Sequence, residues 1–335
     1  MADIRAGLED RRFRRYPGTD PRPERKPAFL VSRRRRERHH PGAVFLVDKP
    51  KGPTSHDIVR DIRRWTGLRR VGHGGTLDPL ASGLLPVFVG VATRLNEYLA
   101  PYRKSYEATV LLGQSTDTDD SEGQVIETAE IPEISEQELH LVLDQFRGEI
   151  EQVPPQYSAV KRDGVAAYRT ARAGERVEID ARAVTVHELT ATTVALPYVT
   201  LTMSVSTGTY VRAIARDLGQ ALGCGAHVTE MRRTAIGAKS ANDGHSPESL
   251  QAAAEADAIW SLAISPADLF PDWPHFHLRG EQLLRIKRGQ KIRHAPVDGW
   301  DKALVLNPEN EVAAVLRRDE LSAATWQPEK VLASG

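Results

Sequence analysis

The chain has 335 residues, of which 40 % are hydrophobic and 27 % are charged. This length allows two or three domains with buried cores, and this composition is typical of a globular protein. The sequence has neither an apolar run of the ~18 residues that a membrane helix requires nor a signal-peptide segment. A single cysteine, Cys224, excludes an internal disulfide and a cysteine-based zinc cluster. We therefore expect a cytoplasmic protein and, since nothing indicates an obligate dimer, a monomer.

The formal net charge of zero hides an uneven distribution of charge. Residues 1–40 contain 13 lysines and arginines against 6 acidic residues, a net charge of +7, and the remaining residues contain 32 against 39, a net charge of −7. Prolines separate the basic runs, so we predict that residues 1–41 form a disordered extension. Such an extension suits a polyanion, because each phosphate contact releases counterions. A solvated tail that only aids solubility is the alternative.

The first ordered elements are predicted from residue 43 onward. Residues 43–50 form a short apolar run that ends at a proline, which is typical of a buried strand. Thr54 and Asp57 have capping-box spacing, which predicts a helix that ends near residue 65. Residues 69–83 have no periodicity and are rich in glycine, which predicts a long structured loop.

The rest of the chain alternates irregularly between strand and helix patterns. Strands are predicted over residues 84–90, 105–113, 124–128, 183–192 and 198–206. Helices are predicted over residues 93–99, after a capping box at Ser135, and over 166–174, 209–223 and 246–258. This order favours an α+β fold with a mostly antiparallel mixed sheet flanked by helices. Short strand-like pieces separated by turn residues predict a small β-rich domain over 272–335.

Several common catalytic motifs are missing from the sequence. There is no GxxxxGK[ST] motif, GHGGTL lacks the third glycine of a dinucleotide-binding loop, and no GxSxG elbow is present. The adjacent His39 and His40 lie in the basic extension without a spaced acidic partner. The sequence therefore gives no support for an ATPase, a dehydrogenase, a serine hydrolase or a zinc enzyme.

The glycine-rich segment VGHGGTLDPLASGLLP, residues 71–86, presents a single carboxylate, Asp78. Glycines allow positive φ angles and close approach of another backbone, and Pro79 restricts Asp78 to extended conformations. The segment therefore holds one acidic side chain in a rigid loop. An Asx turn or a capping role is the alternative for any isolated aspartate.

This segment and FLVDKPKGPTSHDIV, residues 45–59, resemble the TruB family of pseudouridine synthases. The family pattern G-H-x-G-T-L-D-P-x-A-x-G-L-L is matched from Gly72 to Leu85. Further matching blocks follow in the family's order at residues 104–113, 115–123, 154–175, 206–219 and 227–237. Two departures are Gly74, where bacterial members usually have threonine, and Met231, where they usually have leucine; methionine retains an apolar volume similar to that of leucine. The resemblance covers residues 42–240, and the basic extension is not part of it.

The resemblance implies the pseudouridine synthase fold over residues 42–265, with tRNA-gripping insertions around 135–175. It implies isomerisation of uridine-55 in the T loop of tRNA to pseudouridine, with no cofactor and no metal. The target base must leave the RNA stack to reach a folded protein, at a cost of a few kcal/mol. Residues 272–335 resemble a PUA-like RNA-binding domain, for which a β domain that only covers the catalytic domain is the alternative.

The resemblance also assigns roles to individual residues. Asp78 matches the nucleophile, Arg212 the arginine that pairs with it, and Tyr106 the tyrosine that stacks on the base and is a candidate for C5 deprotonation. Substrate-binding positions are matched by His73, which would enter the T loop, and by Tyr210 and Met231, which would wall the pocket. Supporting positions are matched by Lys49, Pro50 and Asp120. Phosphate contacts are expected at Arg69, Arg70, Arg232, Arg233 and Lys161.

Two other functions are consistent with parts of this pattern. A guide-RNA-dependent catalytic subunit would share the chemistry but need partner proteins, and the insertions around 135–175 argue against it. A non-catalytic tRNA-binding or tRNA-folding module would not need a carboxylate in a pocket that faces phosphates. The combination of Asp78, Tyr106 and Arg212 therefore favours catalysis.

Overall fold

The computed structural model describes residues 42–158, 161–162, 165–166 and 178–332. The basic extension predicted for 1–41 and most of the helix predicted for 166–174 lie outside these residues, as does the side chain of Lys161. None of the helices in the described part of the chain has the length and apolar content needed to span a bilayer.

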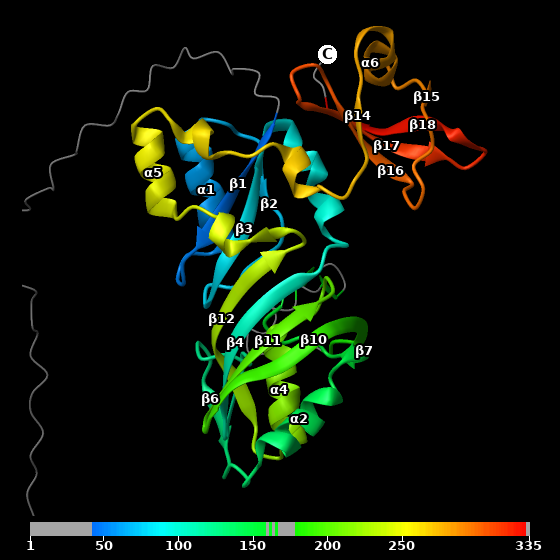
Figure 1. Ribbon diagram of the computed structural model, residues 1–335. Coiled ribbons are helices and arrows are strands. Elements are labelled where there is room, and N and C mark those ends of the chain that lie inside the picture. The colour runs from blue at the N-terminus through cyan, green and yellow to red at the C-terminus, as the bar shows by residue number, and fades with distance from the viewer. Residues whose placement is uncertain (1–41, 159–160, 163–164, 167–177, 333–335) are drawn as a thin grey trace, which may run out of the picture. The chain divides into compact units, whose positions relative to one another are not determined.

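A mixed sheet is the centre of the fold (Figure 1). Its strands are β1 (Ala43–Lys49), β2 (Val71–His73), β3 (Ala81–Val89), β4 (Lys104–Leu112), β7 (Gly148–Gln152), β10 (Arg182–Ala195), β11 (Tyr198–Val205), β12 (Ala226–Ile236) and β13 (Lys239–Ser240). The main path runs β1-β3-β12-β4-β11-β10-β7, with β2 paired to β3 and β13 to β12. All of these pairs are antiparallel except β3 with β12. The predicted α+β class with a mostly antiparallel sheet is confirmed.

Helices flank this sheet, and side chains cap the starts of α1 (Ser55–Thr66), α2 (Glu136–Asp144) and α5 (Pro247–Glu255). The chain also forms α4 (Val211–Ala221) and 3-10 helices at Gly90–Leu99, Ala241–Asp243, Ile259–Leu262 and Pro266–Leu269. Thr54 and Ser135 cap α1 and α2, and each helix has a complete capping box. Helix α4 packs against β12 and helix α2 against β10, which buries their apolar faces in the main core (Figure 1).

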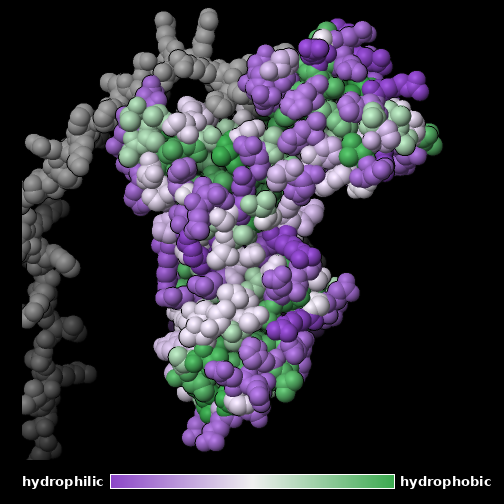
Figure 2. All heavy atoms as spheres, viewed as in Figure 1, coloured by the Kyte–Doolittle hydropathy of each residue, from purple (hydrophilic) through white to green (hydrophobic). Residues whose placement is uncertain are grey.

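Two short hairpins lie outside the main sheet: β5 (Gln114–Thr116) with β6 (Val125–Thr128), and β8 (Lys161–Arg162) with β9 (Val165–Ala166). The strand predicted for 124–128 is therefore present as β6, where Val125 and Ile126 are exposed. In the view of Figure 2, hydrophobic residues gather near the bottom, where Figure 1 labels β6.

Residues from His275 onward form a second sheet, in the order β14-β16-β17-β18-β15. Its elements are β14 (His275–His277), α6 (Gly280–Lys287), β15 (Ile292–Arg293), β16 (Lys302–Leu306), β17 (Val312–Asp319) and β18 (Ser322–Val331). The C-terminal region is thus β-rich, as predicted. One apolar cluster includes residues of β1 and β3 together with residues of β16 and β17.

The structure corrects several sequence-based expectations. The loop predicted for 69–83 contains β2, because Val71–His73 pairs with residues 87–89 of β3. Ala166, the first residue of the helix predicted over 166–174, lies instead in β9, where it pairs with Lys161 of β8. Strands β7 and β12 and helix α6 were not predicted, although β12 is a central strand of the sheet.

Candidate active site

Six of the predicted site residues meet at one cavity. The cavity has a volume of about 860 Å³. Its lining includes Asp78, Tyr106, Asp120, Tyr210, Arg212 and Met231. These residues come from the loop between β2 and β3, from β4 and β12, from the turn after β5 and from the start of α4. The fold therefore brings together residues that are more than 150 positions apart in the sequence.

The loop that carries Asp78 is held at its two ends by backbone hydrogen bonds. The amide of Gly74 donates to the Pro86 carbonyl at 2.7 Å, and the carbonyl of Asp78 accepts from the Ala81 amide at 3.1 Å. The Pro79 carbonyl accepts from Gly52, 2.8 Å away. Since each end of the loop is attached to a neighbouring segment, the Asp78 backbone has a defined position beside the cavity.

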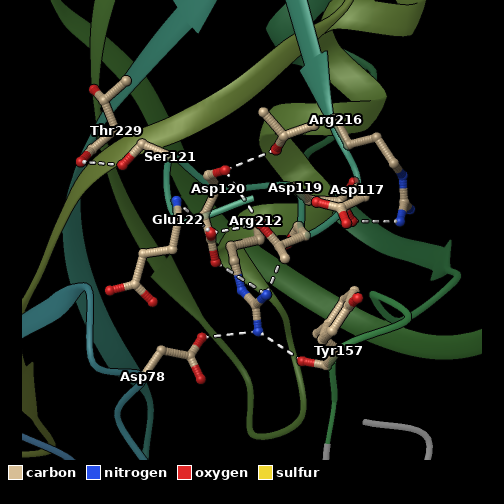
Figure 3. A network of polar contacts seen from close by, with 12 residues as sticks. Asp78, Asp117, Asp119, Asp120, Ser121, Glu122, Tyr157, Arg212, Arg216 and Thr229 are labelled. Atoms are coloured by element: carbon tan, nitrogen blue, oxygen red, sulfur yellow. Dashed lines mark hydrogen bonds and ion pairs between the residues drawn. The ribbon is translucent and has the colours of Figure 1, made fainter. Parts of the chain in front are cut away.

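Arg212 connects Asp78 to the opposite wall of the cavity (Figure 3). Its Nη2 lies 2.9 Å from Oδ2 of Asp78, and its Nη1 lies 3.1 Å from Oδ2 of Asp120. The Arg212 and Asp120 side chains are 5 % and 6 % exposed, whereas that of Asp78 is 34 % exposed. The guanidinium therefore does not bind Asp78 with two nitrogens, but turns one terminal nitrogen toward each carboxylate.

Two backbone carbonyls also accept hydrogen bonds from the terminal nitrogens of Arg212. Nη1 also donates to the Thr118 carbonyl at 2.8 Å, and Nη2 donates to the Tyr157 carbonyl at 3.0 Å (Figure 3). The cation and the carboxylates of Asp78 and Asp120 together carry a net charge of −1. A buried guanidinium thus lies directly against the Asp78 carboxylate, while Asp78 itself still lines the cavity.

Comparisons with known proteins identify the family of this chain. The profile described as "TruB family pseudouridylate synthase (N terminal domain)" matches residues 63–211, and that described as "tRNA pseudouridylate synthase B C-terminal domain" matches residues 212–268. A tRNA pseudouridine synthase B from Thermobifida fusca is 50 % identical over 257 residues, which cover 74 % of this chain and 86 % of the relative. The chain belongs to the TruB family of pseudouridylate synthases.

Other relatives and solved structures extend this result. The tRNA pseudouridine synthase B of Haemophilus influenzae is 39 % identical over 299 residues, covering 88 % of this chain and 96 % of the relative. A chain in a solved Cbf5-Nop10-Gar1 complex is 25 % identical with a TM-score of 0.66, covering 87 % of this chain and 85 % of that chain. A chain in an H/ACA RNP structure with a substrate RNA containing 2′-deoxyuridine has a TM-score of 0.67 at 23 % identity, with 88 % and 86 % covered, which shows the shared fold.

The aromatic and apolar residues expected from the TruB pattern line the cavity. Tyr106 is half-buried on β4, and Met231 is 8 % exposed on β12. Tyr210 precedes α4, and the guanidinium of Arg182 lies 4.7 Å from the centre of its ring. The buried Gln152 side chain fixes the Tyr210 backbone, since Oε1 accepts from the amide at 2.7 Å and Nε2 donates to the carbonyl at 3.1 Å.

The supporting residues Lys49 and Pro50 lie beside the cavity, not among its lining residues. Lys49 is fully buried, and its Nζ donates to the carbonyls of Pro50 at 2.9 Å and Pro53 at 2.8 Å. Burial lowers the pKa of Lys49 to about 8, against the opposing charge of Asp78. The turn that Lys49 holds includes Gly52, which donates to the loop of Asp78.

His73 also lies outside the cavity lining, at the end of β2. Its ring is edge-on to that of His56, with the ring centres 5.8 Å apart. Burial lowers the pKa of His73, and the charges of His56 and Arg233 lower it further. The lowered pKa favours the neutral form of the His73 ring, which suits a ring expected to stack among bases.

The expected phosphate contacts have different surroundings. Arg69 and Arg70 are exposed, whereas Arg232 donates two hydrogen bonds of 2.9 Å to Asp48. Arg233 is only 1 % exposed and donates to backbone carbonyls inside the protein. The expectation of a phosphate contact is therefore wrong for Arg233.

Sequence reasoning missed several residues around the cavity. Ser158 and Arg182 line it, and Tyr157 contributes both to the lining and to the coordination of Arg212. Tyr157 acts through its carbonyl oxygen, which any residue could supply, so residue type alone carried no signal. Lys104 lies two residues before Tyr106 on β4, and this spacing could have indicated a shared face.

Proposed function

We propose that this chain converts uridine-55 in the T loop of tRNA to pseudouridine, with Asp78 as the nucleophile. The observation that carries this proposal is the position of the Asp78 carboxylate, 2.9 Å from a buried guanidinium in a cavity with aromatic walls. Family membership supports the reaction, and the names of the relatives support tRNA as the substrate. Relatives that are 50 % and 39 % identical are named tRNA pseudouridine synthase B, which favours a stand-alone enzyme over a guide-dependent subunit.

The reaction breaks the bond between N1 of uracil and C1′ of ribose and forms a bond between C5 and C1′. The base gains a proton at N1 and loses one from C5. Attack on C1′ and elimination through a glycal both require Asp78 in its ionised form. Arg212 places a positive charge 2.9 Å from that carboxylate, in a buried position where water screens it poorly.

The cavity walls have two further roles in this proposal. Tyr106 stacks on the flipped uracil, which returns about 1–3 kcal/mol of the stacking energy lost in the RNA. Its phenol oxygen is the candidate acceptor for the C5 proton. Tyr210 and Met231 enclose the base and exclude water while the free base reorients.

Contacts outside the cavity hold the RNA. His73 enters the T loop in place of the displaced base, and Arg69, Arg70 and Arg232 contact phosphates. Helix α6 of the C-terminal sheet presents exposed Arg285, Lys287 and Arg288 to a more distant part of the tRNA. A monomer provides all of these groups.

The test is tritium release from C5-labelled uridine in unmodified tRNA, with the purified chain and no other protein. The wild type is expected to release tritium, and Asp78→Asn is expected to release none while it still binds tRNA. Asp61→Asn is a matched control, because Asp61 is a partly buried acid paired with Arg64 in α1. Substitution of uridine-55 by cytidine should abolish release. Turnover by Asp78→Asn at the wild-type rate, or a requirement for a guide RNA, would overturn the proposal.

A further inference from the structure

A single buried hydroxyl holds the residue that precedes Asp78. Ser55, the first residue of α1, is 2 % exposed. Its Oγ donates to the Leu77 carbonyl at 3.0 Å and accepts from the Leu77 amide at 2.8 Å. Both backbone polar groups of Leu77 are therefore bound by the same side-chain atom, which only a group that donates and accepts can do.

A buried arginine holds the two residues before Leu77. Arg233 on β12 donates from Nη2 to the Gly75 carbonyl at 3.1 Å and from Nη1 to the Thr76 carbonyl at 3.4 Å. Its Nε donates to the Leu84 carbonyl on β3 at 2.8 Å. Among the described residues no carboxylate forms an ion pair with Arg233. Its donors are thus used to join the loop of Asp78 to two strands of the sheet.

The contacts of Ser55 and Arg233 hold the backbone next to Asp78, whose own side chain is only partly packed. The Asp78 side chain is 34 % exposed, so its position depends on its backbone and on Arg212. Ser55 and Arg233 bind three consecutive residues before it, and backbone bonds fix Asp78 and Pro79 after it. The Ser55 hydroxyl is not needed to cap α1, because the Thr54 side chain accepts from the Asp57 amide.

We propose that Ser55 and Arg233 are positioning residues that hold the Asp78 carboxylate in its reactive place before RNA binds. This inference rests on the proposed role of Asp78 as nucleophile. A displacement of 1 Å at a reacting group can cost about 100-fold in rate, and a preformed loop avoids ordering it during the reaction. Loss of either residue should therefore slow the chemical step more than it weakens tRNA binding.

The first experiment compares Ser55→Ala with Thr66→Val. Thr66 is a matched control in the same helix, because its hydroxyl donates to the Ile62 carbonyl at 2.6 Å and accepts from the Leu68 amide at 3.3 Å. Single-turnover tritium release with saturating enzyme reports the chemical step, filter binding reports the Kd for tRNA, and thermal unfolding reports stability. Ser55→Ala is expected to slow single turnover about 10- to 100-fold with an unchanged Kd. Thr66→Val should lose stability only.

The second experiment uses Arg233→Lys, with Arg147→Lys as its control. Lysine keeps the charge but lacks the fork that reaches three carbonyls. Arg147 also binds a carbonyl with two nitrogens, since Nε and Nη2 both donate to Leu189, away from the cavity. Arg233→Lys should lower the single-turnover rate with little change in Kd. The double variant Ser55→Ala/Arg233→Lys should lose less than the product of the two single losses, because both residues hold one loop.

The outcomes separate this inference from the proposed function. A wild-type chain that binds tRNA but releases no tritium contradicts the proposed function. An active wild type with full single-turnover rates in Ser55→Ala and Arg233→Lys overturns the positioning role. The positioning role is also overturned if the two variants weaken tRNA binding, measured as Kd, without slowing single turnover. It is overturned as well if the rate loss of the double variant equals the product of the two single rate losses. If Ser55→Ala does not fold, Arg233→Lys decides the question by the same split between rate and Kd.

Discussion

Arg212 is the side chain on which the geometry of the cavity most depends. It contacts the carboxylates of Asp78 and Asp120 and the carbonyls of Thr118 and Tyr157. These partners belong to three separate segments of the chain. One guanidinium therefore fixes the carboxylate of Asp78, the proposed nucleophile, and also joins the walls of the cavity.

We predict that Arg212→Lys loses most of its activity while it retains tRNA binding. A single ammonium group cannot reach two carboxylates and two carbonyls at once, and it leaves Asp120 buried with fewer partners. Single-turnover tritium release should fall at least about 100-fold, since Asp78 loses its fixed partner. Retention of the wild-type rate would contradict the role of the shared guanidinium.

We predict that the stability of the folded protein depends on pH through Asp119, the neighbour of Asp120. Its side chain is 13 % exposed and lies 3.1 Å from Arg216. Burial raises the pKa of Asp119 to about 6, although the charge of Arg216 opposes the shift. The folded protein therefore holds this proton more tightly than the unfolded chain, and the contribution of Asp119 to stability falls as the pH rises from about 4 to about 6.

Asp119→Asn should remove this contribution, because asparagine does not titrate. Asparagine also tolerates the positive φ of 60° at this position. Urea unfolding of both proteins between pH 4 and pH 7 should show the variant gaining stability relative to wild type as pH rises, by at most about 1.4 kcal/mol per pH unit. A difference that is independent of pH would refute the assignment.

At the level of elements, β3 and β12 form the one parallel strand pair of the main sheet within the described part of the chain. Arg233 lies opposite Gly83 in this pair, and Gly83 has a φ of +100°. A Cβ atom at Gly83 would lie 2.2 Å from the Arg233 carbonyl oxygen. The close approach of the two backbones therefore requires glycine at this position.

Gly83→Ala should separate β3 from β12 and so disturb the loop that Arg233 holds. The obstacle is backbone, which cannot rotate away as a side chain could, and the φ angle adds strain. We expect a loss of stability of more than about 1 kcal/mol, measured by urea unfolding, together with slower single turnover. Gly72→Ala is the control, because a Cβ atom at Gly72 meets nothing within 4 Å.

The elements predicted from sequence were those with local signals. Capping boxes at Thr54 and Ser135 located α1 and α2, and alternating apolar residues located β4 and β11. Strand β12 has paired arginines in its second half, a pattern that does not indicate a central strand. Those arginines are accommodated by partners from distant segments, Asp48 and the loop before Asp78, which no local pattern reveals.

Local sequence patterns were also insufficient to predict every residue around the cavity. Family motifs located Asp78, Tyr106 and Arg212, and the structure places all three at one cavity. Ser55 was overlooked, because a serine at the start of a helix is usually interpreted as part of a cap. Its contact with Leu77 crosses 22 positions and depends on tertiary packing.

For the whole molecule, the basic extension is the segment in which positive charge is concentrated. Deletion of residues 1–41 removes a net charge of +7 from the chain. We expect weaker tRNA binding and a shallower dependence of log Kd on log salt concentration, with a nearly unchanged single-turnover rate. Filter binding over a range of salt concentrations measures both effects. An unaltered slope would mean that the extension makes no phosphate contacts.

The position of β12 between β3 and β4 has a consequence for protein synthesis. β3 follows the loop of Asp78, whereas β4 carries Tyr106, and β12 is made long after both. Until residue 236 has emerged from the ribosome, a nascent chain lacks β12. It therefore lacks the strand that joins β3 to β4. The enzyme therefore cannot act on RNA during translation until its last central strand has been added.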